Sequence, residues 1–163
     1  AASVNDHVRK ILPELLKEFQ VIHLCGKGKM DESLNGTEGY VQYEYIKEEL
    51  PDLFALSDVV TSRAGANAIC EISALHKPNL LIPLSANASR GDQILNAQSL
   101  EKRGLCRVLL QENLTRASLT AALNRLWANR EQLEEALRKA PPADGTRRVL
   151  EMIEEVQQKK HHG

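Results

Sequence analysis

The chain has 163 residues, of which 42% are hydrophobic and 26% are charged, and these values are typical of one soluble globular domain. The formal net charge of -1 gives no electrostatic reason to expect a nucleic-acid partner, and an aromatic content of 4% leaves no stacking platform for bases. No apolar run reaches membrane-spanning length, and no signal peptide is visible.

Cysteine and histidine form no metal-ligand pattern. The thiols, at Cys25, Cys70 and Cys106, are widely spaced in apolar surroundings, which predicts buried free thiols in a reducing compartment. His23 lies in an apolar run and is interpreted as a hydrogen-bonded core residue rather than a ligand. His161 and His162 are interpreted as part of a tail or tag. No Asp-x-Asp motif occurs in the chain, so we expect neither a metal nor a cofactor.

Strand-like and helix-like segments alternate from one end of the chain to the other. A helix to about residue 18 has Ser3 or Asn5 as candidate N-cap, and Pro13 marks a kink or restart in it. Strands are predicted at 21–25, 41–45, 59–60, 79–82 and 106–110, and further helices at 48–56, 66–75, 92–103, 115–127, 130–140 and 145–158. Residues 29–38 are expected to be a loop or short helix, and 84–91 a small polar loop.

This alternation predicts an α/β fold with a Rossmann-like, doubly wound parallel sheet in three layers. One domain is expected over residues 1–158, followed by a disordered tail at 159–163. Ligands of such sheets bind at the carboxyl ends of the strands. We therefore expect the segments that follow the strands, at Gly26, Ile46, Ala64–Gly65 and 85–93, to converge on one edge.

The central strand–turn–helix, residues 59–75, is the candidate binding element. Gly65 allows a ligand to approach the backbone closely, and the first N–H groups of the helix point into the same space. This combination favours an anion, and phosphate above all. Glu71 lies close to two turns after Ala64, on the same helix face, where a carboxylate can accept hydrogen bonds from a ribose diol. The alternative is an ordinary α/β junction with a solvated Glu71.

Several motifs together resemble one family, the MurG-type glycosyltransferases. They are Gly39-Tyr40 through Tyr45-Ile46, Leu50-Pro51-Asp52-Leu53, Asp58 through Ala66 with Glu71, Lys77-Pro78 through Leu84, and Asp92-Gln93-Ile94-Leu95-Asn96-Ala97. This family transfers N-acetylglucosamine from UDP-N-acetylglucosamine to undecaprenyl-linked muramoyl-pentapeptide in peptidoglycan synthesis. The resemblance covers the carboxyl-terminal, donor-binding half of a two-domain glycosyltransferase of GT-B type.

The resemblance also implies roles for individual residues in binding the nucleotide. The backbone of Ile46 would bind the uracil edge, and Glu71 would bind the ribose hydroxyls. The Ala64-Gly65-Ala66 turn would contact the diphosphate through backbone N–H groups. Ala64 stands where relatives often have serine, so a hydroxyl contact is replaced by the backbone N–H alone.

The resemblance further implies that Asp92 and Gln93 contact sugar hydroxyls. Arg63 is either a phosphate contact or part of a salt bridge at the edge of the sheet. A metal-independent reaction is expected. Asp92 is interpreted as a binding group, so the catalytic residues remain unknown.

The chain departs from the family pattern at its start. It opens with what resembles the helix after the first strand, so that strand, its glycine-rich phosphate loop and the acceptor-binding half have no counterpart here. We expect either a longer polypeptide or completion of the fold by another chain. By itself the chain is expected to bind UDP-N-acetylglucosamine weakly and to turn over nothing. The full-length protein is expected to be cytoplasmic and peripheral on the inner face of the cell membrane, where it meets the lipid-linked acceptor.

Two other functions are compatible with the residues. One is a soluble subunit that completes a UDP-N-acetylglucosamine transferase with a separate membrane partner. The other is a nucleotide-binding module without catalytic activity. A nucleotide-sugar epimerase is disfavoured, because its catalytic acids are not seen at matching positions.

Overall fold

The computed structural model describes residues 2–44 and 50–140. Its helices are α1 (Ala2–Leu15), α2 (Leu50–Leu56), α3 (Ala66–Ala74), α4 (Ala86–Ser89), α5 (Asp92–Lys102), α6 (Arg116–Ala128) and α7 (Arg130–Lys139). Its strands are β1 (Val21–Leu24), β2 (Tyr40–Tyr43), β3 (Val60–Ser62), β4 (Asn79–Leu81) and β5 (Arg107–Val108). Two short 3₁₀ helices, Glu32–Leu34 and Gln111–Asn113, lie between them. The alternation expected from the sequence is thereby confirmed.

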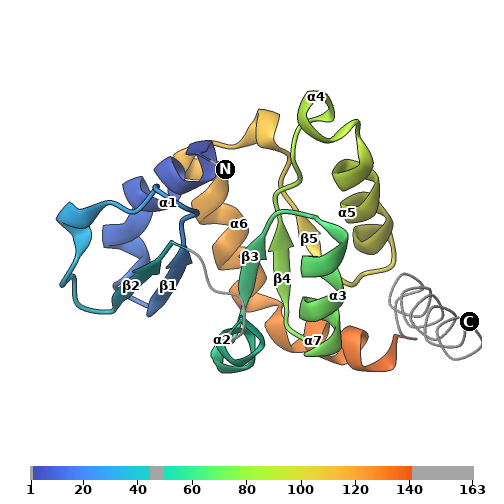
Figure 1. Cartoon of the computed structure of the whole chain (residues 1–163). Helices are drawn as coiled ribbons and strands as arrows, with labels where there is room; N and C mark the ends of the chain where they lie inside the picture. The colour runs from blue at the N-terminus through green and yellow to red at the C-terminus, as the bar shows by residue number, and fades with distance from the viewer. Residues whose placement is uncertain (1, 45–49, 141–163) are drawn as a thin grey trace, which may run out of the picture.

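All described strand pairs are parallel, but they form two separate sheets. One is two-stranded, with β1 beside β2, and the other is three-stranded, in the order β3-β4-β5. In Figure 1, β1 is the strand of its pair that lies nearer to β3. A doubly wound sheet with the strand order 3-2-1-4-5-6 would have its first strand between them. The division of the sheet therefore falls where the missing first strand was expected.

The edges of β1 and β3 that face this division carry backbone groups that no strand within residues 2–44 and 50–140 pairs with. The N–H of Val21 donates to the oxygen of Gly39, just before β2, and the N–H of Cys25 donates to the oxygen of Tyr43 in β2, both at 2.8 Å. In a parallel ladder alternate residues bond to opposite sides, so Ile22 and Leu24 direct their backbone groups away from β2. Among the described residues this sheet also leaves one face uncovered, because its outward side chains are 38–47% exposed: Ile22, Leu24, Val41 and Tyr43.

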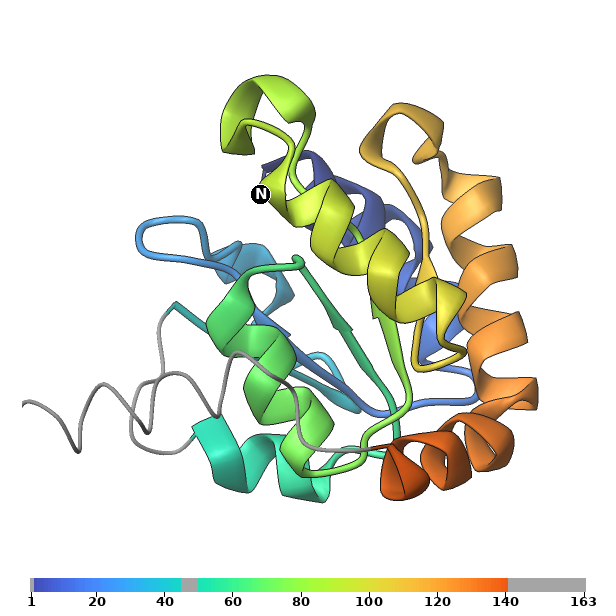
Figure 2. The same ribbon diagram turned by 90° about the vertical axis from the view of Figure 1, so that its right-hand side faces the viewer.

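The core is built on both faces of β4, whose three residues are all buried. Leu80 and Ile82 face a cluster formed with α1, α6 and α7, while Leu81 faces the opposite cluster with Ala97 of α5. This alternation follows from the two-residue period of a strand. Figure 2 shows α3 and α6 on opposite sides of the three-stranded sheet. The three-layer architecture is thus confirmed.

The first helix differs from the expectation. It ends at Leu15, soon after Pro13, rather than near residue 18, and Ser3 and Asn5 lie inside it instead of capping it. The Asn5 side chain is used for tertiary contact, since its Nδ2 donates to the oxygen of Cys25 at 2.8 Å and its Oδ1 lies 3.0 Å from His23 Nε2. His23 is 8% exposed, and its Nδ1 lies 2.8 Å from the Tyr40 hydroxyl. The prediction of a hydrogen-bonded core histidine is confirmed.

Other boundaries follow local capping chemistry. Thr115 caps α6, as expected, in a capping box with Ser118. The segment expected as a loop contains α4, which ends at Arg90 with φ 57°, and Gly91 with φ 83° leads directly into α5. Cys70 is half-buried, whereas Cys25 and Cys106 are buried as predicted, and all are free thiols. The predicted helix 145–158 and the tail 159–163 lie outside the described residues.

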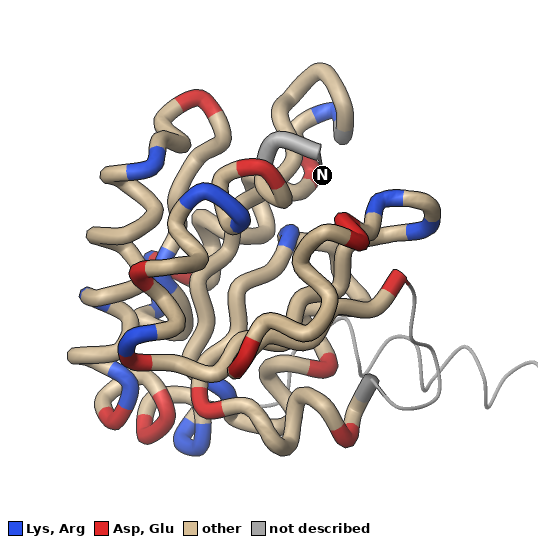
Figure 3. Tube along the Cα trace, turned by 90° about the vertical axis from the view of Figure 1, so that its left-hand side faces the viewer, with Lys and Arg blue, Asp and Glu red and all other residues tan. Residues whose placement is uncertain are grey.

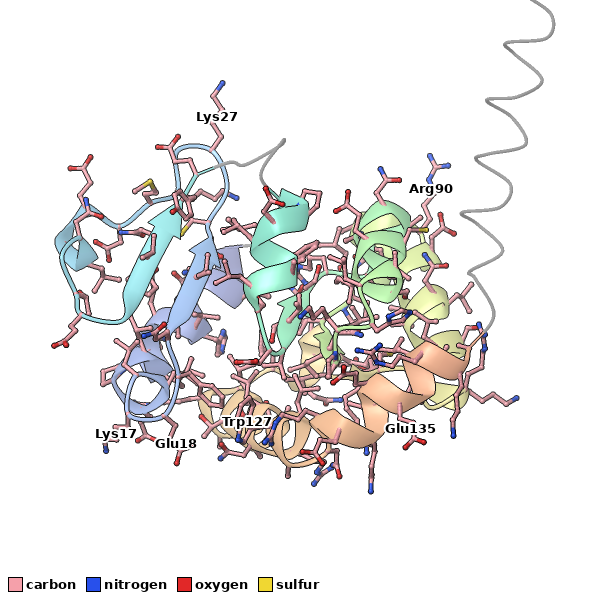
Figure 4. The ribbon with its side chains drawn as sticks, turned by 90° about the horizontal axis from the view of Figure 1, so that it is seen from below. Lys17, Glu18, Lys27, Arg90, Trp127 and Glu135 are labelled. Atoms are coloured by element: carbon pink, nitrogen blue, oxygen red, sulfur yellow. The ribbon has the colours of Figure 1, made fainter. Side chains whose placement is uncertain are left out.

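An aromatic contact joins the segment between α1 and β1 to the junction of α6 and α7. The rings of Phe19 and Trp127 pack edge to face at 5.2 Å, and the Arg130 guanidinium lies 3.9 Å from the centre of the Trp127 ring. Figure 4 shows Trp127 close to Lys17 and Glu18, which lie in this segment. This contact lies away from the carboxyl ends of the strands.

Charged residues of both signs are spread over the helices and loops of the described chain in the view of Figure 3. This distribution agrees with the small net charge. Among the described helices, none combines the length and the apolar composition that crossing a bilayer requires.

Candidate functional site: a pocket between two helix starts

A pocket of about 490 Å³ lies where α3 and α5 begin. Both helices start after parallel strands of the same sheet, so their N-termini meet at its carboxyl edge. The pocket is lined by Gly65, Ala66, Asp92, Gln93, Leu95 and Asn96. The structure thus brings together the predicted turn and the predicted Asp92–Gln93 pair, which lie more than twenty positions apart in the sequence.

The start of α3 offers uncapped backbone donors to this pocket. Gly65 is the N-cap, with φ -70° and ψ 147°, and no side chain caps the helix. The first turn of a helix has no internal acceptors for its N–H groups, so Ala66 and the residues after it retain donors for a ligand. The helix dipole adds partial positive charge at the same place. This end of α3 is suited to an anion such as a phosphate group.

Ala64, by contrast, does not present its N–H to the pocket. The residue is fully buried, and its N–H donates to Oε1 of Gln93 at 3.3 Å. Its carbonyl oxygen accepts a hydrogen bond from Nδ2 of Asn96 at 3.4 Å. Both peptide groups of Ala64 are bonded inside the protein in this structure, and the expected contact of its N–H with the diphosphate stays a prediction. Gly65 and Ala66 are the residues of the turn that line the pocket.

Gln93 is similarly restricted in what it offers to a ligand. Its Oε1 accepts from the N–H of Leu84 at 2.9 Å as well as from that of Ala64. Both neighbours are N–H donors, so the atom between them must be the amide oxygen. The Nε2 group is the part of Gln93 that remains as a donor, and it lies 3.8 Å from the place where a Cβ on Gly65 would stand. Asp92 is exposed at the pocket and supplies carboxylate acceptors.

Glu71 lies further along α3 and does not line the pocket. It lies five positions after Ala66, which corresponds to about 7.5 Å along the helix axis. The residue is half-buried, and among the described residues its carboxylate has no hydrogen-bond or ion-pair partner. Its carboxylate is thus available to a ligand that extends along α3 beyond the pocket.

Arg63 joins the ends of the strands just before the turn. Its Nη1 donates to the oxygens of Ile82 and Pro83, at 3.2 and 3.4 Å, and to Oε1 of Gln111 at 2.7 Å. Its Nε and Nη2 are buried and have no hydrogen-bond partner in the described part of the chain, and burial lowers the pKa of the guanidinium. No carboxylate pairs with it among residues 2–44 and 50–140, so the salt-bridge interpretation receives no support there. Arg63 is an uncompensated positive charge beside the turn.

The remaining expectations concern Ile46 and a metal. Ile46 lies outside the described residues, so its proposed contact with the uracil edge stays a prediction. Within the described part of the chain, no cluster of His, Cys, Asp or Glu has the composition of a metal site. Sequence reasoning missed Asn96, which lies one helical turn after Gln93 on α5 and faces the same turn. The spacing of three positions between Gln93 and Asn96 was the sequence feature that could have indicated it.

The comparison with protein families decides the classification. The model of the glycosyltransferase family 28 C-terminal domain matches residues 1–156. The chain belongs to this family. The UDP-N-acetylglucosamine--N-acetylmuramyl-(pentapeptide) pyrophosphoryl-undecaprenol N-acetylglucosamine transferase of Lachnospira eligens is 59% identical over 155 residues, which are 95% of this chain and 44% of that protein. The enzyme of the same name from Geobacillus thermodenitrificans is 54% identical over 93% of this chain and 42% of its own length.

This chain therefore spans less than half the length of these curated relatives. Among solved structures, MurG of Acinetobacter baumannii aligns with a TM-score of 0.69 at 20% identity, over 92% of this chain and 46% of that one. The glycotransferase of kitacinnamycin aligns with a TM-score of 0.67 at 18% identity, over 82% and 33% of the two chains. At these identities the alignments bear on the fold alone, and they confirm the α/β, Rossmann-like class.

Proposed function

We propose that this chain is the donor-binding half of a transferase that moves N-acetylglucosamine from UDP-N-acetylglucosamine to a lipid-linked muramoyl-pentapeptide in peptidoglycan synthesis. The observation that carries the proposal is the uncapped start of α3, facing a pocket that also holds Asp92. Family membership and the names of the relatives support it. The acceptor site and the base that activates the acceptor hydroxyl belong to the remainder of the full-length protein, which we place on the inner face of the cell membrane.

In this proposal the chain stabilises the departing diphosphate. The N–H groups at the start of α3 donate to phosphate oxygens, and the nearby charge of Arg63 favours the negative charge that grows as the glycosidic bond breaks. Asp92 accepts hydrogen bonds from the sugar, and Gln93 donates one through Nε2. Glu71, further along α3, accepts hydrogen bonds from both ribose hydroxyls. The transfer needs no metal in this scheme, because helix dipole and guanidinium supply the positive charge.

The decisive test is a titration of the chain with UDP and with 2′,3′-dideoxy-UDP, followed by calorimetry or NMR. Hydrogen bonds to a charged group contribute about 1.5–3 kcal/mol, so Glu71→Ala should weaken UDP binding by roughly tenfold to a hundredfold. The same substitution should hardly change binding of the dideoxy compound, which lacks the hydroxyls that Glu71 accepts from. Glu131→Ala, an exposed change on α7, is the matched control.

An equal loss for both nucleotides would show that Glu71 does not recognise the ribose. Absence of UDP binding at millimolar concentration would contradict the proposal for this chain. Saturable transfer of the sugar by this chain alone would contradict the assignment of catalysis to the remainder of the protein.

The structure gives no particular support to the alternative of a subunit with a membrane partner. Such a partner would need an exposed apolar face on the last helices. Leu133 and Leu137, the apolar residues of α7 that face inward, are 5% exposed and pack within the domain. The following segment, 145–158, lies outside the described residues.

A further inference from the structure

We propose that Gln93 and Asn96 are positioning residues, which hold both peptide groups of Ala64 so that the Gly65–Ala66 turn keeps the conformation that receives a diphosphate. This inference rests on the function proposed above. We call the two residues the α5 pair. Both side chains come from α5 and bind the turn before α3, so they connect the two helix starts that form the pocket.

The hydrogen bonds constrain two successive peptide planes. Oε1 of Gln93 accepts the N–H of Ala64, which belongs to the plane before this residue. Nδ2 of Asn96 donates to the carbonyl of Ala64, and that carbonyl shares its plane with the N–H of Gly65. Because a trans peptide is rigid, fixing the carbonyl also fixes the direction of the Gly65 N–H. The α5 pair thus determines where the first donor of the turn points.

The same oxygen of Gln93 ties this turn to the neighbouring strand end. It accepts the N–H of Leu84, three positions after the last residue of β4, at 2.9 Å. The loops that follow β3 and β4 are therefore held to one side-chain atom on α5. A ligand that meets the turn finds its donors already oriented, which reduces the ordering cost of binding.

In this arrangement Gln93 can act toward a ligand as a hydrogen-bond donor only. Its oxygen has two donors already, so a substrate hydroxyl cannot use it as an acceptor. Its Nε2 faces the Gly65 side of the pocket and contributes a donor only. Phosphate oxygens and the lone pairs of sugar hydroxyls are the groups it recognises, whereas Asp92 is the acceptor of the pocket.

The experiment uses the full 163-residue chain and four variants, Gln93→Met, Gln93→Glu, Asn96→Ala and the exposed control Gln98→Ala. Amide hydrogen exchange of Ala64 and Leu84 is measured without ligand, and UDP and uridine are then titrated by NMR. Gln93→Met should accelerate exchange of both amides at least tenfold, because methionine cannot replace the amide oxygen. Gln93→Glu should retain their protection, because a carboxylate oxygen accepts both bonds.

For binding, Gln93→Met and Asn96→Ala should each weaken UDP about tenfold while uridine affinity changes less than threefold, since only the phosphate end depends on the turn. A purely structural role would lower both affinities together. Gln93→Glu should also lose UDP affinity, through the charge that it places beside the diphosphate, and Gln98→Ala should change nothing.

Two results would overturn the inference even if UDP binds as proposed. One is unchanged exchange of Ala64 and Leu84 in Gln93→Met, which would show that the hydrogen bonds do not form. The other is normal UDP affinity in the variants despite faster exchange. A wild-type chain that binds no UDP would instead refute the proposed function, and the inference with it, while the exchange data would still report on the hydrogen bonds.

Discussion

The buried His23 makes the stability of the domain depend on pH in a predictable direction. Nδ2 of Asn5 donates a hydrogen bond to the oxygen of Cys25, so its Oδ1 faces His23 and accepts a hydrogen bond from Nε2–H. The other ring nitrogen, Nδ1, then accepts from the hydroxyl of Tyr40. Burial raises the pKa of Tyr40, which keeps this hydroxyl protonated. The network therefore holds His23 as one neutral tautomer.

The magnitude follows from the displaced pKa. Burial, aided by the positive charge of Arg9, lowers the pKa of His23 from 6.5 to about 4. A folded-state pKa below the unfolded one means that the unfolded chain binds the proton first, so stability is full above pH 6.5 and falls as the pH drops toward 4. For a displacement of this size, linkage predicts a loss on the order of 2 kcal/mol between pH 7 and pH 5. Against a total stability of roughly 5–15 kcal/mol, such a loss is readily measured.

The assay is urea unfolding of the wild-type chain and of His23→Gln at several pH values between 8 and 4.5. Other titrating groups are present in both proteins and cancel in the difference. His23→Gln should lower stability at pH 7 by about 1–3 kcal/mol, because it disturbs a buried hydrogen-bond network. It should also lose less stability than the wild type on acidification, so that the two curves converge toward pH 4.5. Parallel curves over this range would refute the account of a neutral, buried His23.

Three further predictions follow from burial and backbone geometry. Leu126 is fully buried in the core whereas Leu95 is 65% exposed, so Leu126→Ala should cost about 2–5 kcal/mol in urea unfolding and Leu95→Ala under about 0.5. Gly65→Ala should fold normally, since φ is -70° and the added Cβ meets no atom closer than 3.8 Å, yet UDP titration should show weaker binding because the methyl group enters the pocket. The amide of Leu24, which points away from β2, should exchange much faster than that of Cys25, which donates at 2.8 Å; equal rates would mean that the edge of β1 is covered.

The sequence predicted the parallel α/β architecture well because buried strands and capped helices leave local signals. The apolar run 79–82 and the Thr115 cap are examples, and both lie where expected. The start of the first helix was predicted wrongly because the Asn5 side chain can either cap a helix or form tertiary hydrogen bonds. A local pattern shows its capping potential, whereas the tertiary contact with His23 depends on β1, which comes later in the chain. Tertiary hydrogen bonding overrode the local preference.

The candidate site shows a similar division. The turn at Gly65 was predicted from a strand end and the pair Asp92–Gln93 from the family resemblance, and the structure brings them to one pocket. The sequence could not show that the N–H of Ala64 is already bonded, because its partner lies on another helix, 29 positions away. For the same reason Asn96 was missed. Strand ends indicate where a site lies, but the distribution of donors and acceptors within it depends on side chains from separate elements.

β3 borders both the division of the sheet and the pocket. This position is the reason why we expect the chain by itself to bind UDP-N-acetylglucosamine only weakly. Among the described residues β3 is an edge strand, paired only with β4, and the turn that we propose to receive the diphosphate follows it directly. An edge strand lacks half of the hydrogen bonds that hold an interior strand. The α5 pair and Arg63 secure the turn from the β4 side, through Leu84, Ile82 and Pro83. A further parallel strand between β1 and β3 would secure it from the other side and bring its own carboxyl end to the same edge. The turn of the donor site would then be stabilised from both sides of β3.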